Sequence, residues 1–387
     1  MFQRLLTVSG DIEKSFFLFG PRSTGKTSWV KAHFPDALYI DLLKNSDYIY
    51  LQADPSRLET MAMASKSRWV VIDEVQKIPA LLDEVHRLIE AQGKLFVLTG
   101  SSARKLRRGG ANLLAGRALT YHMHPLVVNE IGERVDFGKV LTCGLLPSAY
   151  LETNAKAFLE SYVATYLRQE VMEEGLVRNI GTFGRFMEIA SFSQGSQLNL
   201  SSIAREVGVS RKIVENYFEI LDDLLIAVQL RCFSKRAKRE LVQHPKFYYF
   251  DLGVFRQLRP KGPLDVKEEI GGAAFETLFL QHLRAIIDYH QLDLDIYFWR
   301  TKTGTEVDFV LYGERGLFAF EIKSSAYVEK KDFFGLKTFK KDYPAAQCFL
   351  IYAGERLEQY GDISVIPMPN ALFGLLNILN GNKLTSK

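Results

Sequence analysis

The feature that most constrains this chain is the octapeptide Gly-Pro-Arg-Ser-Thr-Gly-Lys-Thr at residues 20–27. It follows the apolar run 16–19 and leads into a helix-compatible segment that begins at Ser28. Glycines let such a loop wrap a polyphosphate with backbone N–H groups, and the N-terminus of the following helix supplements them. An ordinary glycine-rich turn would leave Lys26 and Thr27 unexplained. The pattern therefore predicts a P-loop, in which Lys26 reaches the β- and γ-phosphates and the Thr27 hydroxyl holds Mg²⁺.

A second apolar run, residues 69–72, ends in the acidic pair Asp73 and Glu74. Four apolar residues in a row are typical of a parallel strand that is covered on both faces. We expect Asp73 to bind Mg²⁺ through water and Glu74 to polarise the attacking water as a general base. The two segments together predict a site that binds and hydrolyses ATP. Its phosphate-binding residues would be Gly20, Pro21, Arg22, Ser23, Thr24, Gly25, Lys26 and Thr27.

A third strand-like run, residues 94–99, continues into Gly-Ser-Ser. In additional-strand P-loop ATPases a polar side chain at this place senses the γ-phosphate, which makes Thr99 and Ser101 candidates. The same residues could equally cap the next helix. Basic residues follow at 104–108, and Arg117 precedes another strand-like run. Arg117 is the favoured candidate for an arginine finger that neutralises charge in the transition state, although most basic clusters are solvated surfaces.

The chain is too long for one ordinary core, with 387 residues of which 47% are hydrophobic. We expect domains at residues 1–147, 148–260 and 261–387.

No apolar run approaches the length that crosses a bilayer, and no signal-peptide core follows the first residues, so we expect a cytoplasmic protein. The cysteines are far apart and odd in number, which fits neither a disulfide framework nor a zinc site; they are Cys143, Cys232 and Cys348.

The middle of the chain predicts a helix-turn-helix. Residues 200–207 and 210–225 are expected to form two serine-capped helices joined by a Gly-Val turn. Residues 225–233 and 246–250 are expected to be strands that flank a basic stretch, which would make a wing.

A net charge of +4 is too small to establish nucleic-acid binding, because counterion release depends on local clusters. The predicted helix-turn-helix supplies such clusters. If it reads DNA, Arg211, Lys212 and Asn216 would face the major groove. The wing residues that would hold phosphates are Lys235, Arg236, Lys238 and Arg239. Acidic residues on the same helix leave a spacer or protein-docking role equally open.

The C-terminal third carries a second constellation of charged residues. Of two adjacent predicted strands, the first bears Asp308 and the second bears Glu321 and Lys323. Residues two apart in a strand share a face, so Glu321 and Lys323 point together. Asp308 and Glu321 could jointly bind a divalent cation, leaving Lys323 to orient or deprotonate the attacking water near a scissile phosphate. This is the arrangement that PD-(D/E)xK nucleases require.

Glu-x-Lys alone is a weak signal, because many exposed strands carry such pairs for solubility. The ordered set is stronger, since a helix bearing Glu276 precedes the strand of Asp308 and the Glu-x-Lys strand follows it. Glu276 is therefore a third candidate metal ligand. Val307 stands where the name of the motif has proline, and Glu306 is expected to be solvated on the alternate face of its strand.

These three parts in this order resemble the prokaryotic AAA-type ATPases fused to a C-terminal domain of unknown function with a PD-(D/E)xK core. The resemblance covers nearly the whole chain and includes the elements Gly-Leu-Leu-Pro at 144–147 and Phe-Asp-Leu-Gly at 250–253. It implies an α/β fold with a P-loop ATPase parallel sheet, in which the P-loop strand lies beside the sensor strand. A helical winged-helix domain and a C-terminal α/β nuclease-like domain would follow.

We therefore expect an ATP-hydrolysing protein that uses Mg²⁺ and whose nucleotide state controls a DNA-acting effector region, with metal-dependent cleavage by that region left open. The alternative is a non-cleaving switch that uses the winged-helix and nuclease-like domains to recognise protein or DNA. The expected partners are ATP and DNA. A protein partner and a second copy of the chain stay open, and no membrane partner is expected.

Overall fold

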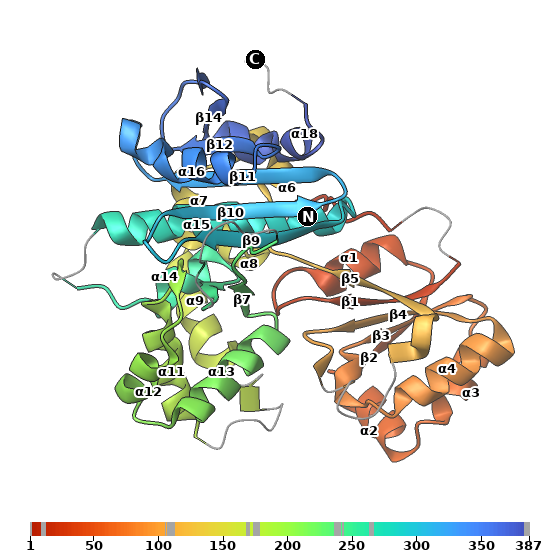
Figure 1. The fold of residues 1–387 in the computed structure, drawn as a ribbon. Helices are drawn as coiled ribbons and strands as arrows, with labels where there is room; N and C mark the ends of the chain where they lie inside the picture. The colour runs from red at the N-terminus through yellow and green to blue at the C-terminus, as the bar shows by residue number, and fades with distance from the viewer. Residues whose placement is uncertain are drawn as a thin grey trace. The chain divides into compact units, whose positions relative to one another are not determined.

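The computed structural model describes residues 2–8, 13–104, 106, 113–167, 171–172, 179–235, 241, 244–262 and 267–382. Contacts divide the chain into two compact units. We call Leu6–His124 with Ile220–Ile226 the N-terminal unit. The C-terminal unit comprises Met1–Leu5, Pro125–Glu219 and Ala227–Lys387. Figure 1 labels many of the helices and strands of each unit.

The N-terminal unit holds a sheet of five strands in the order β2-β3-β4-β1-β5, and each neighbouring pair runs parallel. The strands are β1 Ser15–Phe19, β2 Leu38–Asp41, β3 Trp69–Asp73, β4 Leu95–Gly100 and β5 Ala118–His122. The P-loop strand β1 lies directly beside β4, as the resemblance implies. The predicted parallel sheet is confirmed, and the carboxyl ends of its strands share one edge.

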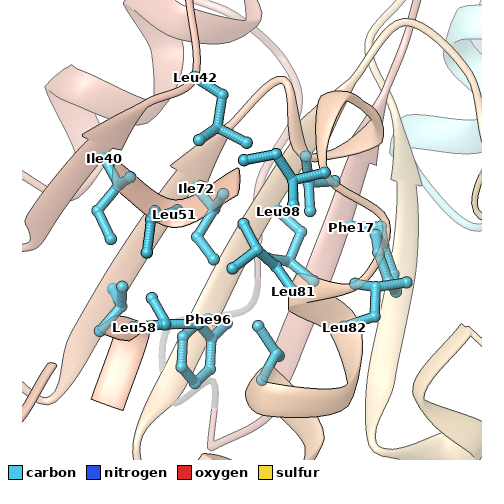
Figure 2. Packing of buried hydrophobic residues seen from close by; sticks show 14 of the residues in the cluster. Phe17, Ile40, Leu42, Leu51, Leu58, Ile72, Leu81, Leu82, Phe96 and Leu98 are labelled. Atoms are coloured by element: carbon cyan, nitrogen blue, oxygen red, sulfur yellow. The ribbon is translucent and has the colours of Figure 1, made fainter. Parts of the chain in front are cut away.

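Helices cover both faces of this sheet (Figure 1). They are α1 Lys26–His33, α2 Asn45–Ala53, α3 Arg57–Ala64, η1 Val75–Lys77, α4 Leu81–Gln92 and η2 Leu113–Gly116. Side chains alternate along β1, so Phe16 contacts Trp29 of α1 while Phe17 belongs to the core beneath α2, α3 and α4. Figure 2 shows this second core, where strand residues such as Ile72 meet Leu81 of α4.

The middle of the chain forms a series of helices and a small sheet. The helices are α6 Val128–Ile131, η3 Gly132–Arg134, α7 Phe137–Cys143, α8 Pro147–Leu151, α9 Ala155–Ser161, η4 Tyr162–Leu167, α11 Ile180–Ser191, α12 Leu200–Val207, α13 Arg211–Asp223 and α14 Leu252–Leu258. The sheet is antiparallel in the order β6-β8-β7, from β6 Ser196–Gln197, β7 Ala227–Leu230 and β8 Lys246–Tyr249. The two helices predicted around the Gly-Val turn are present as α12 and α13.

The last part of the chain forms a mixed sheet in the order β13-β14-β12-β11-β10-β9. Its strands are β9 Leu294–Arg300, β10 Glu306–Gly313, β11 Gly316–Lys323, β12 Gln347–Tyr352, β13 Glu358–Tyr360 and β14 Ile363–Pro367. Phe279 of α15 (Lys267–Tyr289) packs on Phe320, and Phe339 of α16 (Phe334–Asp342) packs on Trp299. The remaining elements are η5 Lys330–Phe333, α17 Met368–Phe373 and α18 Leu375–Leu379.

The segments predicted as second and third domains cluster into one unit. Asp251, fully buried at the start of α14, is one reason. Its carboxylate accepts the N–H of Leu145 at 2.9 Å, that of Val254 at 3.1 Å and the side-chain amide of Gln281 on α15 at 3.0 Å. The two elements at 144–147 and 250–253 therefore meet, and the second is tied to α15. The division into three domains stays a prediction.

Cys143 and Cys348 are buried, and all three cysteines are free thiols. Within the described ranges, no helix has both the length and the apolar character that crossing a bilayer requires.

Candidate functional sites

The phosphate loop lies between β1 and α1, at the carboxyl edge of the N-terminal sheet. Gly25 precedes α1 with a φ of 95°, a left-handed conformation that glycine adopts without strain. Gly20 is so close to the chain after β5 that an added Cβ would lie 2.3 Å from the carbonyl oxygen of Met123. Thr24 Oγ1 donates to the carbonyl of Pro21 at 2.8 Å. The glycines of the motif are thus needed for the path of the backbone.

Lys26 is buried at the start of α1, and its ammonium lies on carbonyls of its own loop. Nζ donates to the carbonyl oxygen of Gly20 at 2.6 Å and to that of Pro21 at 3.1 Å. The positive charge of Lys26 therefore already lies within the loop whose backbone the P-loop pattern assigns to phosphate binding.

Asp73, the last residue of β3, is surrounded by hydroxyl groups. Thr27 Oγ1 donates to Oδ2 at 2.9 Å, and the hydroxyls of Tyr39 and Thr99 also donate to the carboxylate. These donors come from α1, β2 and β4, whose ends meet at the carboxyl edge of the sheet. The predicted partners Thr27 and Asp73 are in direct contact. Tyr39 belongs to no motif and escapes sequence analysis; burial first, and then Asp73, raises the pKa of its hydroxyl.

Glu74 follows with a φ of 62°, which turns the chain sharply after β3. Its backbone N–H donates to Thr99 Oγ1 at 3.1 Å, and the side-chain amide of Gln76 donates to its carboxylate. The same Gln76 amide lies 3.4 Å from Ser101 Oγ. The structure thus brings Thr99 and Ser101 to the acidic pair. Gln76 is a buried member of this group that no sequence pattern reveals.

The donor set at this edge fits a magnesium ion that arrives with a nucleotide. The Thr27 hydroxyl and the Asp73 carboxylate offer oxygen, which Mg²⁺ prefers, and phosphates and water ordinarily supply its other ligands. A cluster of three or more acidic, histidine or cysteine side chains suited to hold an ion by itself does not occur among the described residues.

Arg117 lies away from this edge. It immediately precedes β5, whose first residue pairs with Ser15 at the amino end of β1, whereas the P-loop follows the carboxyl end. A strand of five residues puts about 17 Å between the two edges. The Arg117 guanidinium instead forms an ion pair with Glu90 of α4. The structure therefore places Arg117 away from the nucleotide edge of its own chain, and its role as an arginine finger stays a prediction.

In the C-terminal unit, Asp308, Glu321 and Lys323 converge on neighbouring strands β10 and β11. Asp308 Oδ2 accepts the backbone N–H of Ile322 at 2.9 Å, and Lys323 Nζ donates to Glu321 Oε1 at 2.7 Å. Asp308 and Glu321 are buried, whereas the Lys323 side chain keeps 31% of its exposure. The shared face that the sequence predicts for Glu321 and Lys323 is thus present.

Lys246, the first residue of β8, is the member of this cluster that sequence analysis misses. Its ammonium lies 3.2 Å from Asp308 Oδ1 and 3.5 Å from Glu276 Oε2. It also forms an ion pair with Glu306, whose second oxygen accepts Arg300 Nη1 at 3.0 Å. The expectation that Glu306 is solvated on the alternate face is wrong, because residues 306 and 308 are two apart and share a face.

The carboxyls of this cluster have unusual proton affinities. Burial, and then the charge of Asp308, raises the pKa of Glu276 to about 7, while Lys246 and the Tyr248 hydroxyl act in the opposite direction. Burial and Asp308 likewise raise the pKa of Glu321 well above its usual range. Tyr248 donates to Glu276 Oε2 at 2.6 Å. Lys323 is half-buried, yet Glu321 and Asp308 raise its pKa, so it stays charged.

The residues expected to contact DNA are only partly described. Arg211 and Lys212 are exposed at the start of α13, and Arg211 Nε donates to Glu215 Oε1 at 2.9 Å. Lys235 lies over the ring of Tyr312, 4.2 Å from its centroid. Three further candidates, Arg236, Lys238 and Arg239, lie outside the described residues.

Three family models match the sequence. Residues 13–132 match an AAA domain, and residues 134–265 and 271–371 match two different domains of unknown function, DUF8612 and DUF4143. The chain therefore carries an AAA-type ATPase domain at its N-terminal end, fused to a domain of unknown function at its C-terminal end. The AAA match includes the P-loop and both acidic residues at the end of β3, Asp73 and Glu74.

Proteins of similar sequence match most of this chain. An uncharacterized protein of Mycobacterium tuberculosis is 25% identical over 368 residues, which are 91% of this chain and 79% of that protein. One of Methanocaldococcus jannaschii is 23% identical over 340 residues, covering 77% of this chain and 72% of its own length. The match to the crystal structure of protein VC1899 from Vibrio cholerae covers 90% of this chain and 98% of that chain at 11% identity, with a TM-score of only 0.24.

Proposed function

We propose that this chain is an ATP-hydrolysing switch whose nucleotide state controls a DNA-acting effector region. The observation that carries the proposal is the convergence of three hydroxyl groups on Asp73, beside the P-loop and Glu74. The match to an AAA domain supports ATP hydrolysis. The proposed control is supported by a series of contacts from β4 to the end of α13, described below. The proposed action on DNA is supported by the exposed basic residues Arg211 and Lys212.

Each group at the nucleotide edge has a distinct role in this proposal. The N–H groups of the loop and Lys26 would bind the phosphates, and Thr27 with Asp73 would hold Mg²⁺, whose charge would offset that of the phosphate oxygens. Glu74 accepts a proton from the attacking water. Gln76 orients the Glu74 carboxylate through the hydrogen bond between them. Thr99 links Asp73 to the backbone of Glu74, so a change at the Asp73 carboxylate would reach β4.

A route from β4 toward the middle of the chain supports the proposed control. Arg104, four residues beyond the end of β4, forms an ion pair with Asp223 at the end of α13. Leu225 packs against the hydrophobic core beneath β3 and β4. Both Asp223 and Leu225 belong to Ile220–Ile226, which clusters with the N-terminal unit. A shift of the chain after Thr99 would therefore pull on the helix that bears Arg211 and Lys212.

The C-terminal cluster supports two forms of effector. The order of Asp308, Glu321 and Lys323 favours a metal-dependent nuclease. Lys246 favours the second candidate, a non-cleaving region that recognises DNA or protein, because a cation already contacts the carboxylates of Glu276 and Asp308. We propose the second form for the state described here. Mg²⁺- or Mn²⁺-dependent nicking of plasmid DNA by the pure chain would reject it.

The ATPase proposal is tested by comparing two variants. Lys26→Ala should weaken nucleotide binding, whereas Glu74→Gln should retain ATP and lower turnover by about 10²–10⁴-fold, because only the base is removed. Equilibrium binding of a fluorescent ATP analogue is measured beside phosphate release. Hydrolysis by Glu74→Gln at the wild-type rate would reject Glu74 as the base.

The proposed control is tested through the ion pair of Arg104. In the wild-type chain, a non-hydrolysable ATP analogue should change the affinity for a DNA duplex, and Arg104→Gln should abolish that change while ATP still binds. Typical couplings between sites are about 1–3 kcal/mol, or about 5–150-fold in affinity. Equal DNA affinities with and without the analogue in the wild-type chain would contradict the proposed switch.

A further inference from the structure

Lys246 has the environment that a bound metal ion would have in a carboxylate site. Its side chain is 2% exposed, and its ammonium contacts carboxylates from two elements, α15 and β10. The oxygens are Asp308 Oδ1 at 3.2 Å, Glu276 Oε2 at 3.5 Å and Oε1 of Glu306. A lysine is almost never so deeply buried unless it is paired, and this one is paired with three carboxylates.

Most of the other carboxylate oxygens of the cluster also meet hydrogen-bond donors. Asp308 Oδ2 accepts the N–H of Ile322, and Glu321 Oε1 accepts Lys323. Glu306 Oε2 accepts Arg300, and Tyr248 donates to Glu276 Oε2. Among the described atoms of Asp308 and Glu321, Glu321 Oε2 is the oxygen left without a hydrogen-bond partner. From these two residues, one such oxygen is too few for a divalent ion, which needs several oxygen ligands.

The charges of the cluster also disfavour a bound metal ion. Arg300, Lys246 and Lys323 are paired with the four carboxylates of the cluster, so three positive charges balance most of the negative charge that four ionised carboxylates would carry. An ion between Glu276 and Asp308 would lie against the ammonium of Lys246, and like charges at such distances repel strongly in a site that excludes water. The metal expected for a nuclease-like centre therefore does not fit this arrangement.

We propose that Lys246 is the resident cation of this cluster: it takes the position of a divalent metal and excludes the metal from Asp308 and Glu276. Lys246 belongs to β8, which pairs with β7 and β6, so the same ammonium fastens this small sheet to β10 and α15. The inference concerns the C-terminal unit alone and is independent of ATP hydrolysis.

The first test compares Mn²⁺ binding by the full, nucleotide-free wild-type chain and by Asp308→Asn. Bound Mn²⁺ is measured by the loss of the free-ion signal in electron paramagnetic resonance. Any weak binding at Thr27 and Asp73 is the same in both proteins and cancels in the comparison. We expect identical titrations. A site in the wild-type chain that disappears in Asp308→Asn would overturn the proposal, as would Mn²⁺-dependent plasmid nicking that requires Asp308.

The second test removes the ammonium with little loss of side-chain volume. Lys246→Met should gain one Mn²⁺ per chain, and Lys246→Met with Asp308→Asn should lose it again. Lys341→Met, a change of an exposed lysine on α16, is the matched control and should gain none. A folded Lys246→Met that gains no Mn²⁺ would overturn the exclusion. Should that variant fail to fold, the comparison of the wild-type chain with Asp308→Asn still decides.

Discussion

Asp73 and Asp308 are both buried aspartates on strands, yet their neighbours differ in kind. Asp73 receives hydroxyl groups from Thr27, Tyr39 and Thr99. Asp308 receives a lysine ammonium and a backbone N–H. A hydroxyl oxygen can turn from the carboxylate and become a ligand of a hard cation, whereas an ammonium has no lone pair to offer. The donors around a carboxylate therefore decide whether it suits a metal ion.

The largest expected effect is a loss of ATP turnover when Asp73 is changed, with no loss when Asp308 is changed. Asp73→Asn should lower kcat by about 100-fold or more, because a weakened magnesium site loses several kcal/mol of transition-state stabilisation. Asp308→Asn is the matched change in the C-terminal unit and should leave kcat unchanged. Phosphate release is measured for both at saturating ATP and Mg²⁺. Similar losses in the two variants would remove the distinction between the sites.

The next effect concerns the stability of the carboxylate cluster. Lys246→Met leaves buried carboxylates without their cation, which should cost about 3–5 kcal/mol. Lys341→Met, at an exposed position, should stay within about 0.5 kcal/mol of the wild-type chain. Native-state hydrogen exchange of the β8 and β10 amides measures the free energy of opening. Equal protection in the two variants would mean that Lys246 does not fasten β8.

The sequence predicts the nucleotide edge because its determinants are local. Two glycines, a lysine and a threonine lie within eight residues, and each acidic or polar partner directly ends an apolar strand. Tyr39 lacks such a signal, since it contacts Asp73 across 34 residues and sits in an unremarkable strand. The chain order alone also places Arg117 near the sensor strand, although β5 begins at the opposite edge.

The C-terminal cluster is only half predictable for the same reason. Alternation along β11 gives the pairing of Glu321 with Lys323 directly. Lys246 is 62 residues from Asp308 and 30 from Glu276, and it lies in a different sheet from Asp308. A lone lysine before an aromatic run is ordinarily solvated, so nothing in the sequence marks it as buried. Its role follows from tertiary packing.

A smaller effect should appear as a dependence of stability on pH. The pKa of Glu276 in the folded chain is raised to about 7 from an ordinary 4.5, so the folded state binds this proton more tightly than the unfolded state. The contribution to stability is present below about pH 4.5 and is lost as the pH rises toward 7, by at most about 3 kcal/mol. Glu276→Gln should flatten this slope, whereas the exposed Glu160→Gln should not. Hydrogen exchange of α15 between pH 5 and pH 7, corrected for the intrinsic rate, measures the slope of stability against pH. A slope that Glu276→Gln leaves unchanged would show that another group causes it.

The smallest expected effect tests where recognition lies if the carboxylate cluster holds no metal. Arg211 and Lys212 are neighbours at the exposed start of α13, but the Arg211 guanidinium is already paired with Glu215 at 2.9 Å. Lys212→Gln should therefore reduce the slope of log affinity against log salt by about 0.9, the contribution of one phosphate contact, and Arg211→Gln should reduce it less. Fluorescence anisotropy of a labelled duplex over a salt series measures both slopes. Parallel plots for both variants and the wild-type chain would leave α13 as a spacer or a protein-docking helix, and the DNA-acting part of the proposal would then depend on the wing residues alone.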